Sequence, residues 1–314
     1  MHIPDGFLDV KTAVATAACS ATGLGVALRQ LKTGLSSRRV PLMGLAAAFV
    51  FAAQMLNFPV AGGTSGHLLG AVLIAVLLGP GAAIVVMSAV LIVQCFLFAD
   101  GGVLSLGANI FNMGVIAPLC GYGIYRGVYA LLKGKRGQLV SIGFAAWCST
   151  VLAAVFCTGE LAWSGTVSWK VGFPAMVNVH ILIGVGEALI TTLVVAAIGR
   201  TRPDLLEENG AGRDSKGYIA PVVYGLLIAI GLIIFVSPFA SPWPDGLEKV
   251  AATFGFDRKA VTSPVSPAPL ADYQVPGIGS ISVATVLAGG VGMAVVFLLS
   301  FLLARLLVPK SEPE

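Results

Sequence analysis

Long apolar runs, separated by short polar or Gly- and Pro-containing segments, make up most of this 314-residue chain. Most of these runs approach or exceed the roughly 20 residues that a helix needs to cross a hydrocarbon core about 30 Å thick. We expect a membrane-spanning helix in each of nine runs: 11–31, 40–56, 67–79, 81–99, 108–132, 138–158, 174–199, 218–238 and 281–308. Only Gly79-Pro80-Gly81 lies between the third and fourth runs, so these two form either a tight helical hairpin or one kinked element.

The composition agrees with a membrane protein and excludes a soluble domain. Hydrophobic residues make up 57% of the chain and charged residues 11%, whereas a soluble domain carries roughly 25% charged residues. The net charge of +4 does not indicate a nucleic-acid partner, because the basic residues are distributed by membrane side. The five cysteines lie in apolar runs without CxxC spacing, which is typical of small core residues. The expected fold class is therefore an all-α, multi-pass membrane protein surrounded by lipid.

Basic residues follow alternate apolar runs. They gather after the first, fifth, seventh and ninth runs, at Arg29, Lys32, Arg38, Arg39, Arg126, Lys133, Lys135, Arg136, Arg200, Arg202, Arg213, Lys216, Arg305 and Lys310. The positive-inside rule then predicts that the amino terminus lies outside and the carboxyl terminus in the cytoplasm. An odd number of crossings agrees with this orientation, and the expected location is the inner membrane of a prokaryotic cell.

Two polar segments divide the pattern. The mixed-charge segment 200–217 predicts a cytoplasmic linker between a seven-span unit, 1–210, and a two-span unit, 211–314. The outer loop of the second unit, 239–280, contains Pro244-Asp245-Gly246-Leu247-Glu248. A loop of this length is usually either functional or disordered.

The amino terminus itself offers metal-binding chemistry. No basic residue precedes the first apolar run, so a signal peptide is not indicated, and the large side chain of His2 disfavours removal of Met1. The terminal amine, the deprotonated amide of His2 and its imidazole Nδ1 can close two fused chelate rings around one ion. A fourth nitrogen would complete a square-planar set, the geometry that Ni(II) and Cu(II) prefer.

His67 is the candidate for the fourth nitrogen. It follows the polar loop 57–66, on the same predicted side of the membrane as Met1. Four polar residues near it are candidates to orient the ligands: Gln54, Asn57, Thr64 and Ser65. The competing interpretation is that His2 is a chance terminal residue and that these four side chains serve only the loop.

Other polar residues lie within the apolar runs. His180 and Glu187 are one heptad apart, so both can face the same side of the seventh run. They are either functional or a buried, hydrogen-bonded pair. Asn109, Asn112 and Asn178 are typical of hydrogen bonds between membrane helices.

Two other function classes fit parts of the sequence. Gly63-Thr64-Ser65-Gly66 fits the GxSG pattern of intramembrane serine proteases, with His180 as a conceivable base. A secondary divalent-metal transporter is the other alternative. The chain has no GxxxxGK[ST] motif, so it carries no P-loop ATPase of its own.

The opening Met1-His2-Ile3-Pro4-Asp5-Gly6-Phe7-Leu8 and the segment Gly62-Gly63-Thr64-Ser65-Gly66-His67-Leu68 resemble the metal-binding segments of the M components (NikM/CbiM) of nickel and cobalt energy-coupling-factor (ECF) transporters. The resemblance implies that Met1, His2 and His67 hold the metal. The PDGLE segment is similar to the small N component, so the chain resembles an M–N fusion.

This resemblance implies a transporter subunit without enzymatic activity and without a resident cofactor. The implied partners are a transmembrane T component and cytoplasmic ATP-binding cassette ATPases. Pro4-Asp5 stands where cobalt members typically have Met-Glu, which favours Ni(II) as the transported ion, with Co(II) as the alternative. Residues 218–314 contain no His or Cys, so we expect them to aid loading without supplying a metal ligand.

Overall fold

The computed structural model describes residues 1–206, 219–261 and 265–308, and nearly all of its regular structure is helical. The longer helices are α1 (Val10–Gly34), α2 (Val40–Gln54), α4 (Pro80–Phe98), α6 (Ala117–Leu131), α7 (Gly134–Trp163), α8 (Trp169–Thr201), α9 (Ile219–Gly231) and α11 (Ile281–Leu307). The shorter elements are α3 (Ala71–Leu78), α5 (Leu106–Asn109), α10 (Gly246–Phe254) and a hairpin of β1 (Phe58–Val60) and β2 (Thr64–Gly66). A π-helical segment, Ile110–Ile116, joins α5 to α6, and a second one, Leu232–Val236, continues α9.

The chain is a multi-pass membrane protein, although the predicted number of nine crossings is not confirmed. Within the described residues, six helical segments are long and apolar enough to cross a bilayer: α1, α4, α7, α8, α11 and the continuous stretch Ile219–Phe239. Each of the other three predicted runs also contains helix, but α2 is only about 22 Å long and α3 about 12 Å. The third run falls short because residues 67–70 form a loop and Gly79, at φ +89°, ends the helix.

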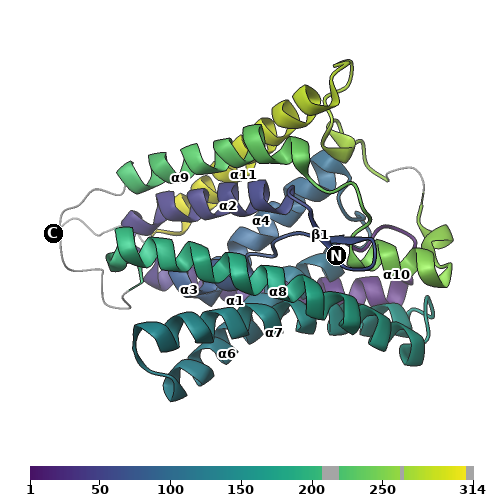
Figure 1. The fold of residues 1–314 in the computed structure, drawn as a ribbon, viewed down its shortest axis with the longest axis horizontal. Helices are drawn as coiled ribbons and strands as arrows, with labels where there is room; N and C mark the ends of the chain where they lie inside the picture. The colour runs from purple at the N-terminus through teal and green to yellow at the C-terminus, as the bar shows by residue number, and fades with distance from the viewer. Residues whose placement is uncertain (207–218, 262–264, 309–314) are drawn as a thin grey trace.

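The C-terminal helices pack directly on the first unit, so the two predicted units share one core. Helix α11 lies against α2 and α4, and α9 lies against α2 (Figure 1). The contact is close because α11 presents glycine there: a Cβ on Gly292 would lie 2.2 Å from the Phe51 ring. Small residues that let helices approach closely are typical of membrane interfaces. The boundary at 210/211 and most of the predicted linker, including Arg213 and Lys216, lie outside the described residues, as does Lys310.

The segments that the sequence predicts on the outer side meet at one end of the molecule, where the amino terminus, β1 and α10 lie (Figure 1). Backbone hydrogen bonds join them: Gly102 donates to the carbonyl of Ile3 at 2.9 Å, and Val261 donates to that of Asp5 at 2.9 Å. Similarly, the amide of Ser241 donates to the carbonyl of Asn57 at 2.8 Å. Which side of the membrane this end faces stays a prediction.

Candidate metal centre

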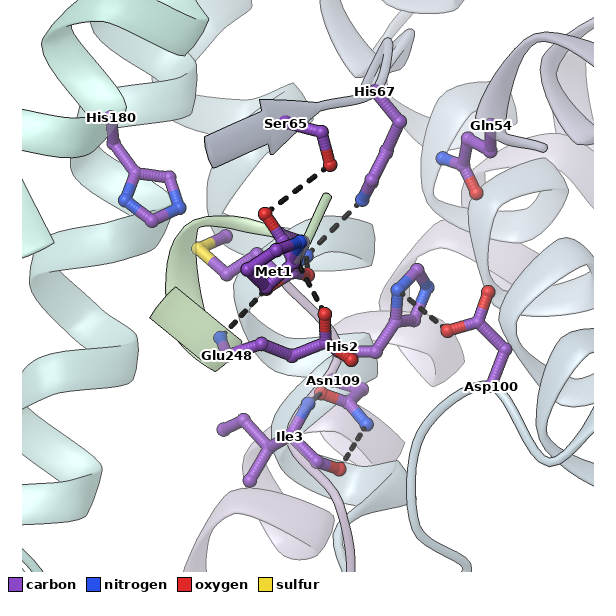
Figure 2. A network of polar contacts seen from close by, with 12 residues as sticks. Met1, His2, Ile3, Gln54, Ser65, His67, Asp100, Asn109, His180 and Glu248 are labelled. Atoms are coloured by element: carbon purple, nitrogen blue, oxygen red, sulfur yellow. Dashed lines mark hydrogen bonds and ion pairs between the residues drawn. The ribbon is translucent and has the colours of Figure 1, made fainter. Parts of the chain in front are cut away.

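The first residues of the chain fold back into this end of the molecule as an extended, buried segment. Asn109 binds both backbone groups of Ile3, accepting from its amide at 2.8 Å and donating to its carbonyl at 3.1 Å (Figure 2). The carboxylate of Asp5 accepts from the amides of Val103 at 3.1 Å and Leu104 at 2.8 Å. The sequence predicted that Asn109 forms a hydrogen bond to another helix. It instead binds the terminal segment, because the backbone groups of Ile3 have no partner within that segment.

These anchors hold the terminal amine beside two side chains from distant parts of the chain. The Met1 nitrogen lies 3.1 Å from Nε2 of His67 (Figure 2). It also lies 2.5 Å from Oδ2 of Asp245. Burial disfavours the charged amine, but the carboxylate of Asp245 outweighs this, so the pKa of the amine is raised. Burial acts against the charge of Asp245 too, yet the ammonium group keeps the pKa of this carboxyl below its usual range.

His67 presents a free nitrogen to this amine. Its Nδ1 lies 3.2 Å from the carbonyl oxygen of Leu68, which can only accept, so Nδ1 carries the hydrogen and Nε2 has the lone pair. Burial, together with the positive charge of the Met1 amine, lowers the pKa of His67 to about 3. The imidazole is therefore neutral at physiological pH, which is the form that binds metals.

The spacing of amine and imidazole fits a square-planar site. Two nitrogens on adjacent corners of a square, each about 2.0 Å from the metal, would be about 2.8 Å apart. The measured separation of the Met1 nitrogen and Nε2 of His67 is 3.1 Å. No group of three or more His, Cys, Asp or Glu residues able to hold a metal ion exists within the part of the chain that the structure describes. The donors predicted at the amino terminus differ from such a group, because two of them, the Met1 amine and the His2 amide, are backbone nitrogens.

His2 lies next to His67, but its ring is turned toward other partners. The two imidazole rings stack with centroids 5.4 Å apart. Nδ1 of His2 is 3.1 Å from Asp100, and Nε2 is 3.2 Å from the amide oxygen of Gln94. Burial lowers the pKa of His2 despite the nearby carboxylate of Asp100. Closing the predicted chelate therefore requires the ring of His2 to rotate away from Asp100.

Three of the polar residues predicted near His67 contact other groups. The hydroxyl of Ser65 donates to the carbonyl of Trp243 at 2.7 Å, and its amide donates to the carbonyl of Pro244 at 2.8 Å. Thr64 is buried in β2 next to it, and Asn57 contributes its backbone carbonyl to the bond with Ser241. Ser65 and the backbone of Asn57 therefore attach the β1–β2 hairpin to the C-terminal unit.

The serine protease interpretation has no support in these contacts. The hydroxyl of Ser65 is donated to a backbone carbonyl of the C-terminal unit. Nδ1 of His180 is hydrogen-bonded to the carbonyl of Met176, one helical turn back, at 2.8 Å. Among the described residues, Ser65 and His180 share no hydrogen bond, so no catalytic pair is present there.

His180 instead lies beside a small cavity next to the amine. The cavity has a volume of about 20 Å³, and Met1, His67, Asp245 and Gly246 also line it. This volume holds about one water molecule. Figure 2 shows His180 on the side of Met1 opposite to His2. His180 is thus near the candidate site without contacting the amine.

The sequence analysis assigned no contact to two important residues of the C-terminal unit. Asp245 starts α10 through a capping box with Glu248 and also binds the Met1 amine. Tyr273 donates its hydroxyl to Asp100 at 2.6 Å and stacks on Phe98 with ring centroids 4.6 Å apart. The PDGLE segment drew attention to the loop that carries Asp245, but no local pattern indicated that Asp245 binds the Met1 amine. No sequence motif indicated Tyr273.

Comparisons with known proteins agree on one family. Residues 2–205 match the family CbiM, described as the cobalt uptake substrate-specific transmembrane region, and residues 220–309 match the PDGLE domain. The chain is 36% identical over 307 residues to the putative fused nickel transport protein NikMN of Archaeoglobus fulgidus. This alignment covers 97% of this chain and 98% of that protein.

Two further similarities concern another fused protein and a solved structure. The chain is 32% identical over 253 residues to the fused nickel transport protein NikMN of Rhodobacter capsulatus, covering 76% of this chain and 72% of that protein. A crystal structure of a transition metal transporter aligns with a TM-score of 0.59 at 36% identity, covering 67% of this chain and 95% of that one.

Proposed function

The chain belongs to the CbiM family of cobalt-uptake substrate-specific transmembrane proteins, followed by a PDGLE domain, and from this premise we propose that it captures Ni(II) for an ATP-driven importer of the ECF type. The metal is its transported substrate. Met1, His2 and His67 bind the ion through the amine, the His2 amide and two imidazole nitrogens. Co(II) is the competing substrate.

One observation carries this proposal: the amine of Met1 and Nε2 of His67 lie 3.1 Å apart. Met1 is buried and His67 is half-buried, and the hydrogen bond from Nδ1 of His67 to Leu68 leaves Nε2 with its lone pair. Four nitrogen donors in a plane favour Ni(II) over ions that prefer oxygen or tetrahedral ligands. The identified relatives named as nickel transport proteins support the same substrate.

The sequence contains no P-loop, so in this proposal the ATP that drives transport is hydrolysed by other subunits. We propose a transmembrane T component and cytoplasmic ATP-binding cassette ATPases as its partners. The test is uptake of radioactive nickel by cells that express the chain with these partners. Uptake should disappear when the P-loop lysine of the ATPases is replaced, and uptake that persists would favour a secondary transporter.

The C-terminal unit holds the amino terminus over the site in this proposal. Asp245 binds the Met1 amine at 2.5 Å, and the loop ahead of α10 is bonded to Ser65. On the other side, Tyr273 binds Asp100, which in turn contacts His2. These contacts support a role in loading, in which the unit closes the metal-binding segment without supplying a metal ligand.

The loading role is tested by replacing residues 239–279 with a short Gly-Ser linker that keeps both flanking helices. Nickel uptake by cells should fall, whereas purified wild-type protein loaded with nickel should keep its metal when the loop is later cut by a protease. Unchanged uptake would leave the loop as a tether only. Loss of the metal on cutting would mean that the loop supplies a ligand.

A further inference from the structure

A buried carboxylate lies behind the loop that carries His67. Glu187 of α8 is 1% exposed and accepts two backbone hydrogen bonds, from the amide of Leu69 at 2.5 Å and from that of Gly70 at 2.9 Å. These amides belong to the loop between β2 and α3, just before the first turn of α3. Amides at this position have no partner inside the helix, so a carboxylate there satisfies them and interacts favourably with the helix dipole.

The amide of Leu69 also connects Glu187 to His67. It belongs to the peptide group between Leu68 and Leu69, whose carbonyl oxygen accepts the hydrogen from Nδ1 of His67 at 3.2 Å. A peptide group is planar and rigid, so fixing its N–H also fixes the direction of its C=O. The next carbonyl, that of Leu69, is held in turn by the side-chain amide of Gln54 at 2.9 Å.

We propose that Glu187 is a positioning residue for the metal site, acting on His67 through the Leu68–Leu69 peptide. The carboxylate orients the peptide, the peptide carbonyl holds Nδ1–H of His67, and Nε2 is thereby directed at the Met1 amine. This arrangement resembles the chain of carboxylate, histidine and metal found at many metal sites, with a peptide group inserted between the first two members. The inference rests on the proposed role of His67 as a metal ligand.

Polarisation adds to this geometric effect. A negative charge on the N–H side of a peptide strengthens its carbonyl as an acceptor. A stronger bond to Nδ1–H makes the imidazole more basic at Nε2, and outer partners of this kind typically change metal affinity by about 10- to 100-fold. Glu187 does not touch the metal ligands itself, so its effect must pass through His67.

The test compares Glu187→Gln with Glu160→Gln in the full chain purified with its natural terminus. Glu160 is a matched control, because it is also a buried carboxyl group of a long helix, 6% exposed, and its partner Asn112 lies outside the metal-binding loop. Glutamine at position 187 keeps the size of the side chain but brings an N–H group toward one of the two backbone amides. We expect the affinity for Ni(II) to fall about tenfold in Glu187→Gln and to stay within about twofold in Glu160→Gln.

A double-mutant cycle with His67→Ala separates positioning from general loss of structure. If Glu187 acts through His67, Glu187→Gln should cause no further loss of affinity once His67 is absent. An additional tenfold loss in the His67→Ala background would overturn the proposal, as would an unchanged affinity in the single variant. Thermal unfolding of each variant serves as the folding control, and Glu187→Asp replaces Glu187→Gln if the latter does not fold.

The same experiment distinguishes this inference from the proposed function. Wild-type protein that binds no nickel would refute the proposed capture of the metal. Nickel binding that is lost in His67→Ala but unaffected in Glu187→Gln would refute only the role of Glu187. The visible absorption of the nickel complex gives a second readout, because a displaced His67 ligand shifts this spectrum whereas a merely less stable protein does not.

Discussion

Nickel binding at this site should release about two protons per ion near pH 7, because the amine and the His2 amide must both lose a proton before they can bind. The perturbation is a change of pH. His67 contributes no proton in this range, since burial and the neighbouring amine lower its pKa to about 3. The amine contributes one, because its pKa is raised above the ordinary value of 8.0 by Asp245 despite its burial.

The magnitude follows from this count. Each released proton raises the apparent affinity about tenfold per pH unit, so two protons give about 100-fold per unit. Affinity should therefore increase with pH and be lost on acidification, while His67 remains neutral throughout. Protonation of the amine, and not of an imidazole, would then limit binding at neutral pH.

Asp245→Asn provides a matched variant, since Asn still caps α10 but carries no charge for the amine. Burial then opposes the charged amine with only the carboxylates of Asp100 and Glu248 left to support it, so the pKa of the amine should be lower than in the wild type. At about pH 8 the variant should therefore release fewer protons per nickel ion than the wild type.

Calorimetry in buffers of different ionisation enthalpy counts these protons, and competition with a chelator at several pH values gives the affinity. A release of about three protons would refute the reasoning, because an imidazole would then have to be protonated beforehand. A release of about one in the wild type would mean that the His2 amide is not a ligand. Equal proton release by the wild type and Asp245→Asn would show that the carboxylate does not control the amine.

Three further outcomes are expected. His67→Ala should weaken nickel binding at least about tenfold, or 1.4 kcal/mol, whereas His180→Ala should leave it within about twofold in the same chelator competition; the reverse result would assign the fourth nitrogen to His180. Asp5→Ala removes the carboxylate that accepts hydrogen bonds from the amides of Val103 and Leu104, so metal occupancy should fall. The free energy of unfolding, measured by denaturant titration, should decrease by about 1–3 kcal/mol. Gly102→Ala should displace the terminal segment, because its Cβ would lie 2.1 Å from Oδ1 of Asp5, and metal content equal to wild type would contradict this.

The sequence predicted the helical membrane fold well, because apolar periodicity and length are local properties of the chain. The number of membrane crossings and the length of the helix in the third run were harder to predict. Residues 67–79 are apolar enough for a helix, but the loop 67–70 is held by contacts with α2 and α8 that no local pattern contains. Gly79, at φ +89°, then ends α3 after eight residues.

The same distinction applies to the candidate site. Met1, His2 and His67 were selected from the donor chemistry of the terminus and the position of one histidine, and the structure brings the amine and His67 together. Asp245 is 244 residues from Met1, and the sequence placed it only in the PDGLE segment of the outer loop, with no partner assigned. Met1 and Asp245 meet only because the C-terminal unit packs on the first unit, and this packing cannot be read from a single sequence.

The central claim is that the free amine of Met1 binds the transported metal, and the most direct measurement is the nickel content of the purified protein with one residue added before Met1. The addition keeps every side chain but moves the amine by about 3.8 Å along the chain, away from His67. Elemental analysis should find about one nickel ion in the protein with its natural terminus and almost none in the extended protein. Full nickel occupancy in the extended protein would contradict the claim.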